Sequence, residues 1–201
     1  MLNENFVYLG VALSFLGALS YLIGTLKGEV QPSKVTWFVW SLAPLVAFWA
    51  TVQQGVGVQS LLTFMVGFNP LLIFLASFVN KKAYWKITKL DVTCGVLAVG
   101  GLVLWKMTDI PDLAIFFGIL VDAIAAIPTV IKSFQEPETE NANLFLGSGI
   151  AALITLLTIK AWNFEQFAFP AYIFGIDAIL FVLIKFKLGK KWQDFNLSLH
   201  G

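Results

Sequence analysis

Long apolar runs alternate with short polar turns along the whole chain. Each run is too long for a strand and close to the roughly 20 mostly apolar residues that a helix needs to cross a bilayer. The pattern therefore predicts an all-α integral membrane protein with seven transmembrane helices. The predicted spans are 6–26, 35–53, 58–79, 90–107, 111–132, 142–160 and 167–187.

Two of these runs match each other at a spacing of 108 residues. When 66–78 is aligned with 174–186, most positions are apolar in both, and Asn69 falls opposite Asp177. A polar residue in the middle of a transmembrane helix is costly, and such residues usually have a function. The match therefore predicts an internal repeat and makes Asn69 and Asp177 candidates for a substrate site.

A second match lies in the turns that follow the first and fifth spans. At a spacing of 105, Lys27 aligns with Lys132 and Pro32 with Pro137. Three spans are an odd number, so a second copy fused directly to the first would be inverted, and the extra span 90–107 makes the two three-helix repeats parallel. The predicted single membrane domain, 1–201, consists of repeat one (6–79), a linker with the fourth span (80–110), repeat two (111–187) and a cytoplasmic tail (188–201).

The composition agrees with a membrane protein, and the lysines predict its orientation. Hydrophobic residues make up 58% of the chain and charged residues only 12%. There is no arginine, and of the 13 lysines only Lys106 and Lys160 fall on the predicted outer side. Because lysine-rich loops face the cytoplasm, we expect a multi-pass protein of the plasma or inner membrane, with the N-terminus outside and the C-terminus cytoplasmic. The lipid bilayer accounts for the lysine clusters, so no nucleic-acid partner is expected.

One segment resembles a known family signature. Residues 128–144 begin with Pro128, near the end of a repeat's first helix, and continue through Lys132 and a polar turn into the second helix. This order resembles the PQ-loop (MtN3-like) signature, and nearly the whole chain resembles a SWEET-type transporter with a 3+1+3 arrangement of seven helices. Thr129 replaces the glutamine of the signature, and repeat one has Ile23-Gly24 at that position.

The resemblance implies a function and several site residues. It implies a transporter that moves a small polar solute, with a sugar favoured, by alternating access through a path between the repeats. An asparagine on each repeat's third helix faces the substrate in that family, which points to Asn69 and, as an acidic replacement, to Asp177. The acid adds the option of proton coupling. Family prolines near the inner helix ends act as hinges, which points to Pro128 and Pro44.

Other residues are candidates for their own chemistry. Asp122 lies well inside the fifth span. There it either has a direct role in binding the substrate or carrying a proton, or it hydrogen-bonds to a neighbouring helix. Trp40 can stack on a sugar or a heterocyclic ring. Trp37, at the predicted inner boundary, is expected to be an interfacial anchor. Asn69 has an alternative role as a polar bridge between helices.

Three acidic residues crowd the turn after the fifth span. We expect Glu136, Glu138 and Glu140 to form a solvated turn. An ion pair between one of them and Lys34 or Lys27 is the alternative, and it would close a gate between the repeats. Surface ion pairs contribute little to stability, which favours the solvated turn.

Several other classes of protein do not fit the residues. A single cysteine, Cys94, and a single histidine, His200, leave no metal-ligand cluster, so neither a metal nor a cofactor is expected. The sequence shows no pairing of a nucleophile with a base, so we do not expect an enzyme. A retinal protein needs a lysine deep in its last span, whereas Lys185 lies at the end of that span and Asp177 in its middle.

Two alternatives of function stay open. One is a vitamin, nucleoside or amino-acid transporter of the same fold, because the bacterial nicotinamide-riboside transporters share this architecture and are rich in tryptophan. The other is a membrane receptor or signalling protein that transports nothing. In either case the expected partners are a small-molecule solute and the bilayer, with a homo-oligomer left open.

Overall fold

The structure is a computed structural model that describes residues 3, 5–53, 58, 60–83, 85–107, 111–160, 162 and 164–200. Within these residues the protein is all-α, with eight α-helices, one short 3-10 helix and no strand. The helices are α1 (Phe6–Lys27), α2 (Lys34–Gln53), α3 (Ser60–Ala76), α4 (Lys89–Lys106), α5 (Pro111–Gln135), η1 (Pro137–Thr139), α6 (Ala142–Thr158), α7 (Phe164–Phe186) and α8 (Leu188–His200).

Three of these helices are long and apolar enough to cross a membrane. They are α1, residues 115–135 of α5 and residues 166–186 of α7, while α3 and α6 are apolar but shorter. This finding indicates a multi-pass membrane protein. All seven predicted spans coincide with a helix to within a few residues, and α8 lies within the expected tail 188–201.

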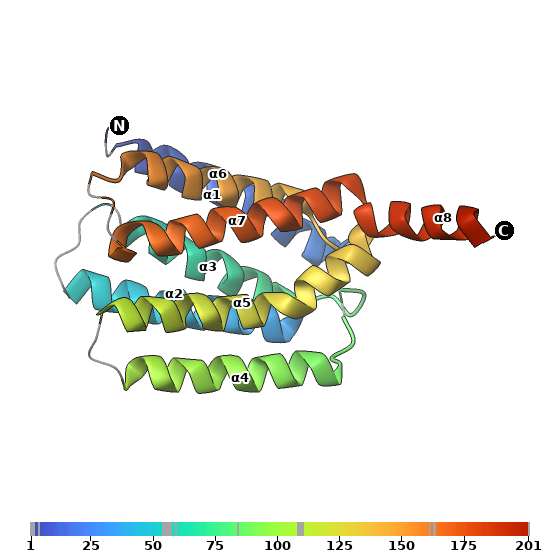
Figure 1. Ribbon diagram of the computed structural model, residues 1–201, viewed down its shortest axis with the longest axis horizontal. Helices are drawn as coiled ribbons and strands as arrows, with labels where there is room; N and C mark the ends of the chain where they lie inside the picture. Colours follow the sequence, from blue (N-terminus) through green and yellow to red (C-terminus); the bar gives the residue numbers. More distant parts are fainter. Residues whose placement is uncertain are drawn as a thin grey trace.

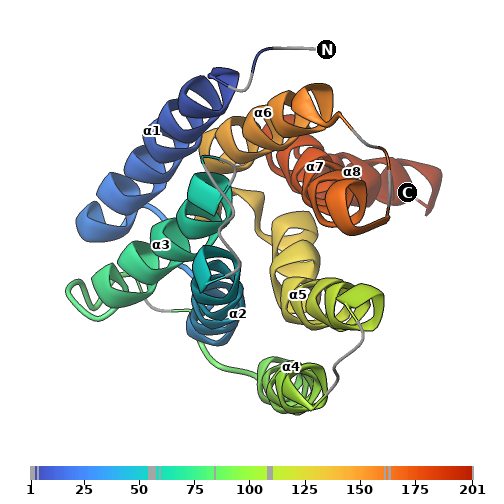
Figure 2. The same ribbon diagram turned by 90° about the vertical axis from the view of Figure 1, so that its left-hand side faces the viewer.

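Six of the helices form a closed ring. Contacts between neighbours follow the order α1, α3, α2, α5, α7, α6 and back to α1 (Figure 2). Helices that follow one another along the chain run in opposite directions, so α1, α3, α5 and α7 share one direction (Figure 1). The expected linker helix, α4, lies outside the ring and packs against α5 and α2.

Small residues bring several of these helices into close contact. A Cβ atom at Gly17 would lie 2.6 Å from the carbonyl oxygen of Asn143, and one at Gly147 would lie 2.5 Å from that of Leu13. The backbones of α1 and α6 therefore approach too closely for any larger residue at these two positions. This interdigitated contact, the α1–α6 seam, joins the first half of the chain to the second.

The outer helix α4 also packs through glycine. Cβ atoms at Gly95 and Gly101 would lie 2.6 Å from a methyl of Val35 on α2 and 2.5 Å from a methyl of Val121 on α5. At its first turn, Asp91 accepts a hydrogen bond of 3.0 Å from Ser33. Both contacts hold α4 across the line where α2 meets α5.

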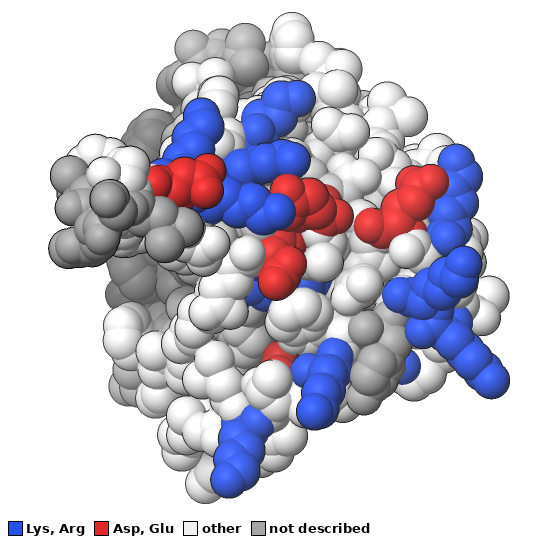
Figure 3. All heavy atoms as spheres, turned by 90° about the vertical axis from the view of Figure 1, so that its right-hand side faces the viewer, with Lys and Arg blue, Asp and Glu red and all other residues white. Residues whose placement is uncertain are grey.

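Lysine side chains gather at the end of the molecule that carries α8 (Figure 3). We call this end, where α1, α5 and α7 finish, the lysine-rich end. α8 extends past the bundle (Figure 1) and is joined to it where Lys187 and Lys190 form ion pairs of 3.1 and 2.7 Å with Glu138. At its start, Gly189 lies so near the carbonyl of Phe134 that no side chain would fit.

Candidate functional site

A small cavity of about 50 Å³ lies in the middle of the ring, and each of the six ring helices contributes to its wall. This volume has room for only a few water molecules. The four substrate-site candidates from the sequence, Asn69, Asp177, Trp40 and Asp122, all line it. Residues 108 positions apart thus contribute to one cavity, although binding of a substrate by these residues stays a prediction.

Asp122 is held in place from two sides. Its side chain is buried, at 5% exposure. Tyr172 on α7 donates a hydrogen bond of 2.7 Å to its Oδ2 atom, and the indole nitrogen of Trp40 on α2 donates one of 3.3 Å to its backbone oxygen. Trp40 therefore joins α2 to α5 through its N–H group while its ring lines the cavity.

Asp177 lies near Asp122 with fewer partners. Its side chain is buried at 7% exposure, and the hydroxyl of Ser148 on α6 hydrogen-bonds to it. Its Oδ2 atom has no hydrogen-bond partner among the described residues. Asp122 and Asp177 line the same cavity. A buried carboxylate oxygen without a donor is costly, so this atom needs a ligand, water or a proton.

Asn69 also has one side-chain atom with a hydrogen-bond partner and one without. Its Nδ2 atom donates a hydrogen bond of 3.1 Å to the Ser14 hydroxyl on α1, so the side chain does bridge two helices. Its Oδ1 atom is buried and unpartnered within the described part of the chain. The two residues that align in the repeat, Asn69 and Asp177, thus each leave one acceptor oxygen free at the cavity.

A ladder of aromatic rings leads from the cavity toward the lysine-rich end. The centroids of Tyr21 and Trp37 are 4.7 Å apart, and those of Trp37 and Trp40 are 5.3 Å apart with the rings edge to face. Trp37 is only 1% exposed, so the expectation of an interfacial anchor is wrong. It is buried because its ring packs against those of Tyr21 and Trp40 in the core of the bundle.

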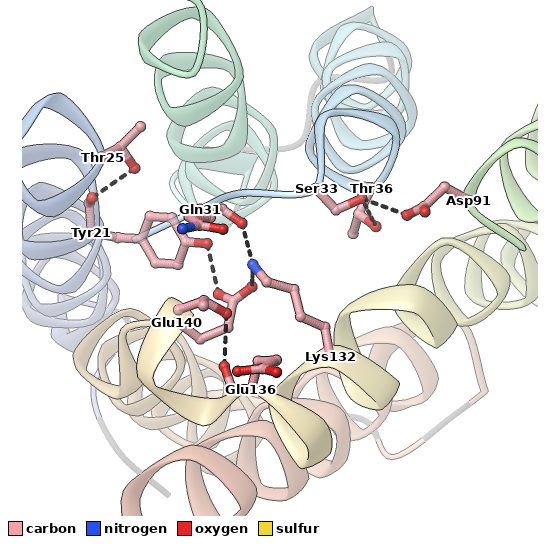
Figure 4. Close-up of polar contacts among 10 residues, drawn as sticks. Tyr21, Thr25, Gln31, Ser33, Thr36, Asp91, Lys132, Glu136 and Glu140 are labelled. Carbon is pink, nitrogen blue, oxygen red and sulfur yellow. Dashed lines mark hydrogen bonds and ion pairs between the residues drawn. The ribbon is translucent and has the colours of Figure 1, made fainter. Parts of the chain in front are cut away.

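A buried polar network lies next to Tyr21, toward the lysine-rich end (Figure 4). The ammonium group of Lys132 lies 2.7 Å from the Oε1 atom of Glu140, and Tyr21 donates a hydrogen bond of 2.6 Å to the Oε2 atom of the same carboxylate. Lys132 also donates to the backbone oxygen of Gln31 and lies over the ring of Trp85. We call Tyr21, Gln31, Lys132 and Glu140 the end network.

The end network corrects the expectation for the acidic turn. Glu136 and Glu138 are exposed, as a solvated turn requires, but Glu140 is 6% exposed. It forms its ion pair with Lys132, not with the anticipated Lys34 or Lys27. The network nevertheless connects the two halves of the chain, because Tyr21 and Gln31 precede α2 whereas the ion pair belongs to the segment from α5 to α6.

Proline interrupts the helices around the cavity. Pro128 lies inside α5, and that helix bends toward its C-terminal end (Figure 1). A proline removes one backbone hydrogen bond and favours such a bend. The hydroxyls of Thr129 and Ser133 on the next turn are buried without partners among the described residues. Pro44, the other expected hinge, lies inside α2.

The described residues contain no group of three or more His, Cys, Asp or Glu side chains placed to hold a metal ion. The sequence reasoning did not select Ser14, Ser148 or Tyr172, which hold the polar residues of the cavity. No sequence signal marked them, because a helical serine can bond to its own backbone and Tyr172, five positions before Asp177, does not share its face of the helix.

Searches of protein-family models, of curated proteins and of solved structures found no match to this chain. The likeness to SWEET-type transporters therefore rests on the sequence residues given above, and membership of that family stays a prediction.

Proposed function

We propose that this protein is a transmembrane transporter that moves a small polar solute by alternating access through a path between two parallel three-helix repeats. One observation carries the proposal. A central cavity whose mainly apolar wall carries Asn69, Asp122 and Asp177 is separated from the lysine-rich end by a buried network that joins the two halves of the chain. A sugar is the solute that the SWEET resemblance favours, with the lysine-rich end cytoplasmic and the N-terminus outside.

The order of the helices supports the two repeats. Exchanging α1, α2 and α3 with α5, α6 and α7 turns the ring order α1, α3, α2, α5, α7, α6 into itself. This is the order that two parallel copies about a central axis would produce. Residues at matching positions also meet at the cavity, because Trp40 and Phe145, which are 105 positions apart, line it together with Asn69 and Asp177.

The end network fits the role of a closed gate. A solute that leaves the cavity toward the lysine-rich end must pass Trp37 and Tyr21 and then separate Tyr21 from Glu140 and Gln31 from Lys132. Pro128 lies one turn before Lys132 on α5, so a change in the bend at Pro128 would move the lysine. The gate then opens by a change of angle in α5 while the rest of the ring stays packed.

Access to the cavity from each side tests this proposal without knowledge of the solute. In a Cys94→Ala background, Ile173→Cys places a thiol on a buried wall of the cavity. In sealed vesicles, a membrane-impermeant thiol reagent should label it slowly from the lysine-rich side. Adding Glu140→Gln should speed labelling from that side several-fold. Equal rates from that side with and without Glu140→Gln would contradict the gate.

Flux is the second measurement. Proteoliposomes that contain the purified protein are loaded in turn with radiolabelled glucose, sucrose, amino acids and nucleosides, and uptake is compared with empty liposomes. We expect at least one solute to exchange. A solute that binds the protein and is never carried would instead support the receptor alternative.

A further inference from the structure

The charge balance of the central cavity is one-sided. Two carboxylates, Asp122 and Asp177, belong to its wall, and none of the described residues that line it is a lysine or histidine. Lys132, on the same helix as Asp122, already forms an ion pair with Glu140 in the end network. The acids of the cavity therefore have no cationic side chain as a partner within it.

Two acceptor oxygens of the cavity wall are also without a hydrogen-bond partner among the described residues. The amide nitrogen of Asn69 and the hydroxyl of Tyr172 each already donate to a neighbouring side chain, and the indole nitrogen of Trp40 donates to a backbone oxygen. The buried oxygens Oδ1 of Asn69 and Oδ2 of Asp177 accept nothing from the described residues. Asn69 keeps a second N–H group besides the one that it donates to Ser14.

A neutral sugar suits this arrangement poorly. Each sugar hydroxyl both donates and accepts, so a sugar site supplies donors and acceptors in comparable number. An ammonium group donates only and carries the charge that two carboxylates lack. The remaining wall is apolar and aromatic, with Trp40, Phe145 and Ile176, and an aromatic face attracts a cation.

The geometry points to a compact organic cation, a protonated amine with a ring or a short apolar body, as the ligand that the central cavity takes up when the helix ring opens, since the closed cavity holds only a few water molecules. Its N–H groups would reach the free oxygens of Asn69 and Asp177, and its body would contact Trp40. This inference rests on the proposed function in that it names the solute class of the same site. It makes a cation, and not the neutral sugar of the family resemblance, the preferred solute.

Matched pairs of probes that differ only in the ammonium group test the inference. The purified protein in lipid nanodiscs is titrated at neutral pH with glucosamine and glucose, and with 2-phenylethylamine and 2-phenylethanol, while its thermal unfolding midpoint is followed. A hydrogen bond to a charged group should make the amine of at least one pair bind about 10- to 100-fold more tightly than its alcohol. The phenyl pair controls for partition of the body into lipid.

Variants locate the effect. Asp177→Asn keeps the shape of the side chain and its ability to accept from Ser148, and it should abolish the preference for the amine. Asp194→Asn removes a carboxylate from the exposed surface of α8 and should leave the preference unchanged. If Asp177→Asn does not fold, Asn69→Ser removes the other free acceptor and should weaken amine binding while leaving alcohol binding as it was.

The outcomes separate the ligand class from the transport proposal. Alcohols that bind as tightly as their amines, or amines that cause no shift at all, would overturn the cationic ligand, whatever the flux assays show. A preference for the amine that survives Asp177→Asn would overturn it too. Amines that bind through Asp177 but do not cross the membrane in proteoliposomes would support the ligand class and overturn transport.

Discussion

The ion pair of Lys132 and Glu140 is almost completely removed from solvent, with side-chain exposures of 1% and 0%. Two charges in such a place lose their hydration, and their attraction offsets that loss only when further hydrogen bonds satisfy them. Tyr21 and the backbone of Gln31 supply those bonds. The pair therefore adds little net stability, yet the loss of one partner leaves a buried charge alone.

We predict that Glu140→Gln lowers the free energy of unfolding by about 3–5 kcal/mol, the usual effect of an unpaired buried charge. Denaturant or thermal unfolding in detergent measures it. Glu138→Gln is the matched control, because that carboxylate is exposed and its loss should change little. Lys132→Met combined with Glu140→Leu should recover most of the lost stability. Equal effects of Glu140→Gln and Glu138→Gln would show that the pair is not buried in solution.

The sequence predicted the polar residues of the cavity better than their surroundings. Asp122 and Asp177 were identifiable because a carboxylate cannot face lipid cheaply, so it must point inward. Ser14 and Ser148 gave no such signal, since a helical hydroxyl can bond to its own backbone anywhere. Glu140 looked like part of a solvated turn, and only the folded ring brings Tyr21, 119 positions away, against it.

At the scale of helices, the α1–α6 seam depends on residues without side chains. Gly17 and Gly147 each face a backbone carbonyl of the opposite helix at a distance where a Cβ would overlap it. Backbone atoms, unlike the end of a flexible side chain, cannot move aside. The seam is therefore intolerant of even one added methyl group on either side.

We predict that Gly17→Ala destabilises the protein by about 1–3 kcal/mol, as overpacking usually does. Gly118→Ala on α5 is the control, because a Cβ there meets nothing within 4 Å. The control should be neutral or slightly stabilising, since alanine favours the helix. The measurement is the thermal unfolding midpoint in detergent. A Gly17→Ala protein as stable as the control would mean that α1 and α6 are farther apart than described.

The attachment of α8 has a defined pH range. Hydrogen bonds from Lys190, from the backbone of Glu138 and from Lys187 lower the pKa of the Glu138 carboxyl from an ordinary value of 4.5 to about 2. A carboxyl with a lowered pKa stabilises the folded state fully above its ordinary pKa, and this contribution is lost as pH falls through the folded value. The attachment should thus persist at pH 5 and weaken progressively as the pH falls from about 4.5 to about 2.

We predict that hydrogen exchange in 188–200, corrected for its intrinsic pH dependence, is equally protected at pH 7 and pH 5. Glu138→Gln at pH 7 should reduce that protection, and high salt should do the same to the parent because the pair is exposed. If Glu138→Gln and the parent exchanged equally at low salt, other contacts, such as that of Gly189 with Phe134, would hold α8.

Most helices were predictable because each required only a long apolar run. The expected tail 188–201 was not recognised as helical, since α8 is short, polar and charged over much of its surface. Two glycines of the fourth span lie against α2 and α5. Gly67 and Gly175 align in the repeat, but only Gly67 lies against a neighbouring helix, at Leu45.

For the whole molecule, the sequence implied two copies but not how they meet. The halves of the chain touch along two lines, α1 with α6 and α2 with α5. The first is the interdigitated α1–α6 seam. The second is less extensive, includes the bond from Trp40 to the backbone of Asp122, and is covered from outside by α4. Sequence matching treats these lines as equivalent, whereas in the structure the close glycine contacts lie on the first line.

This difference predicts which line stays fixed when the halves move. If α1 and α6 form the pivot, a covalent link between them should not stop transport. A Cβ at Gly10 would lie 3.5 Å from the Cβ of Ala151, within the range of a disulfide. We predict that Gly10→Cys with Ala151→Cys, in a Cys94→Ala background, forms this disulfide on oxidation. Uptake of whichever panel solute the parent carries should be the same before and after reduction. Uptake that falls on oxidation and returns with reductant would show that this seam moves, and that the α2–α5 line is the pivot.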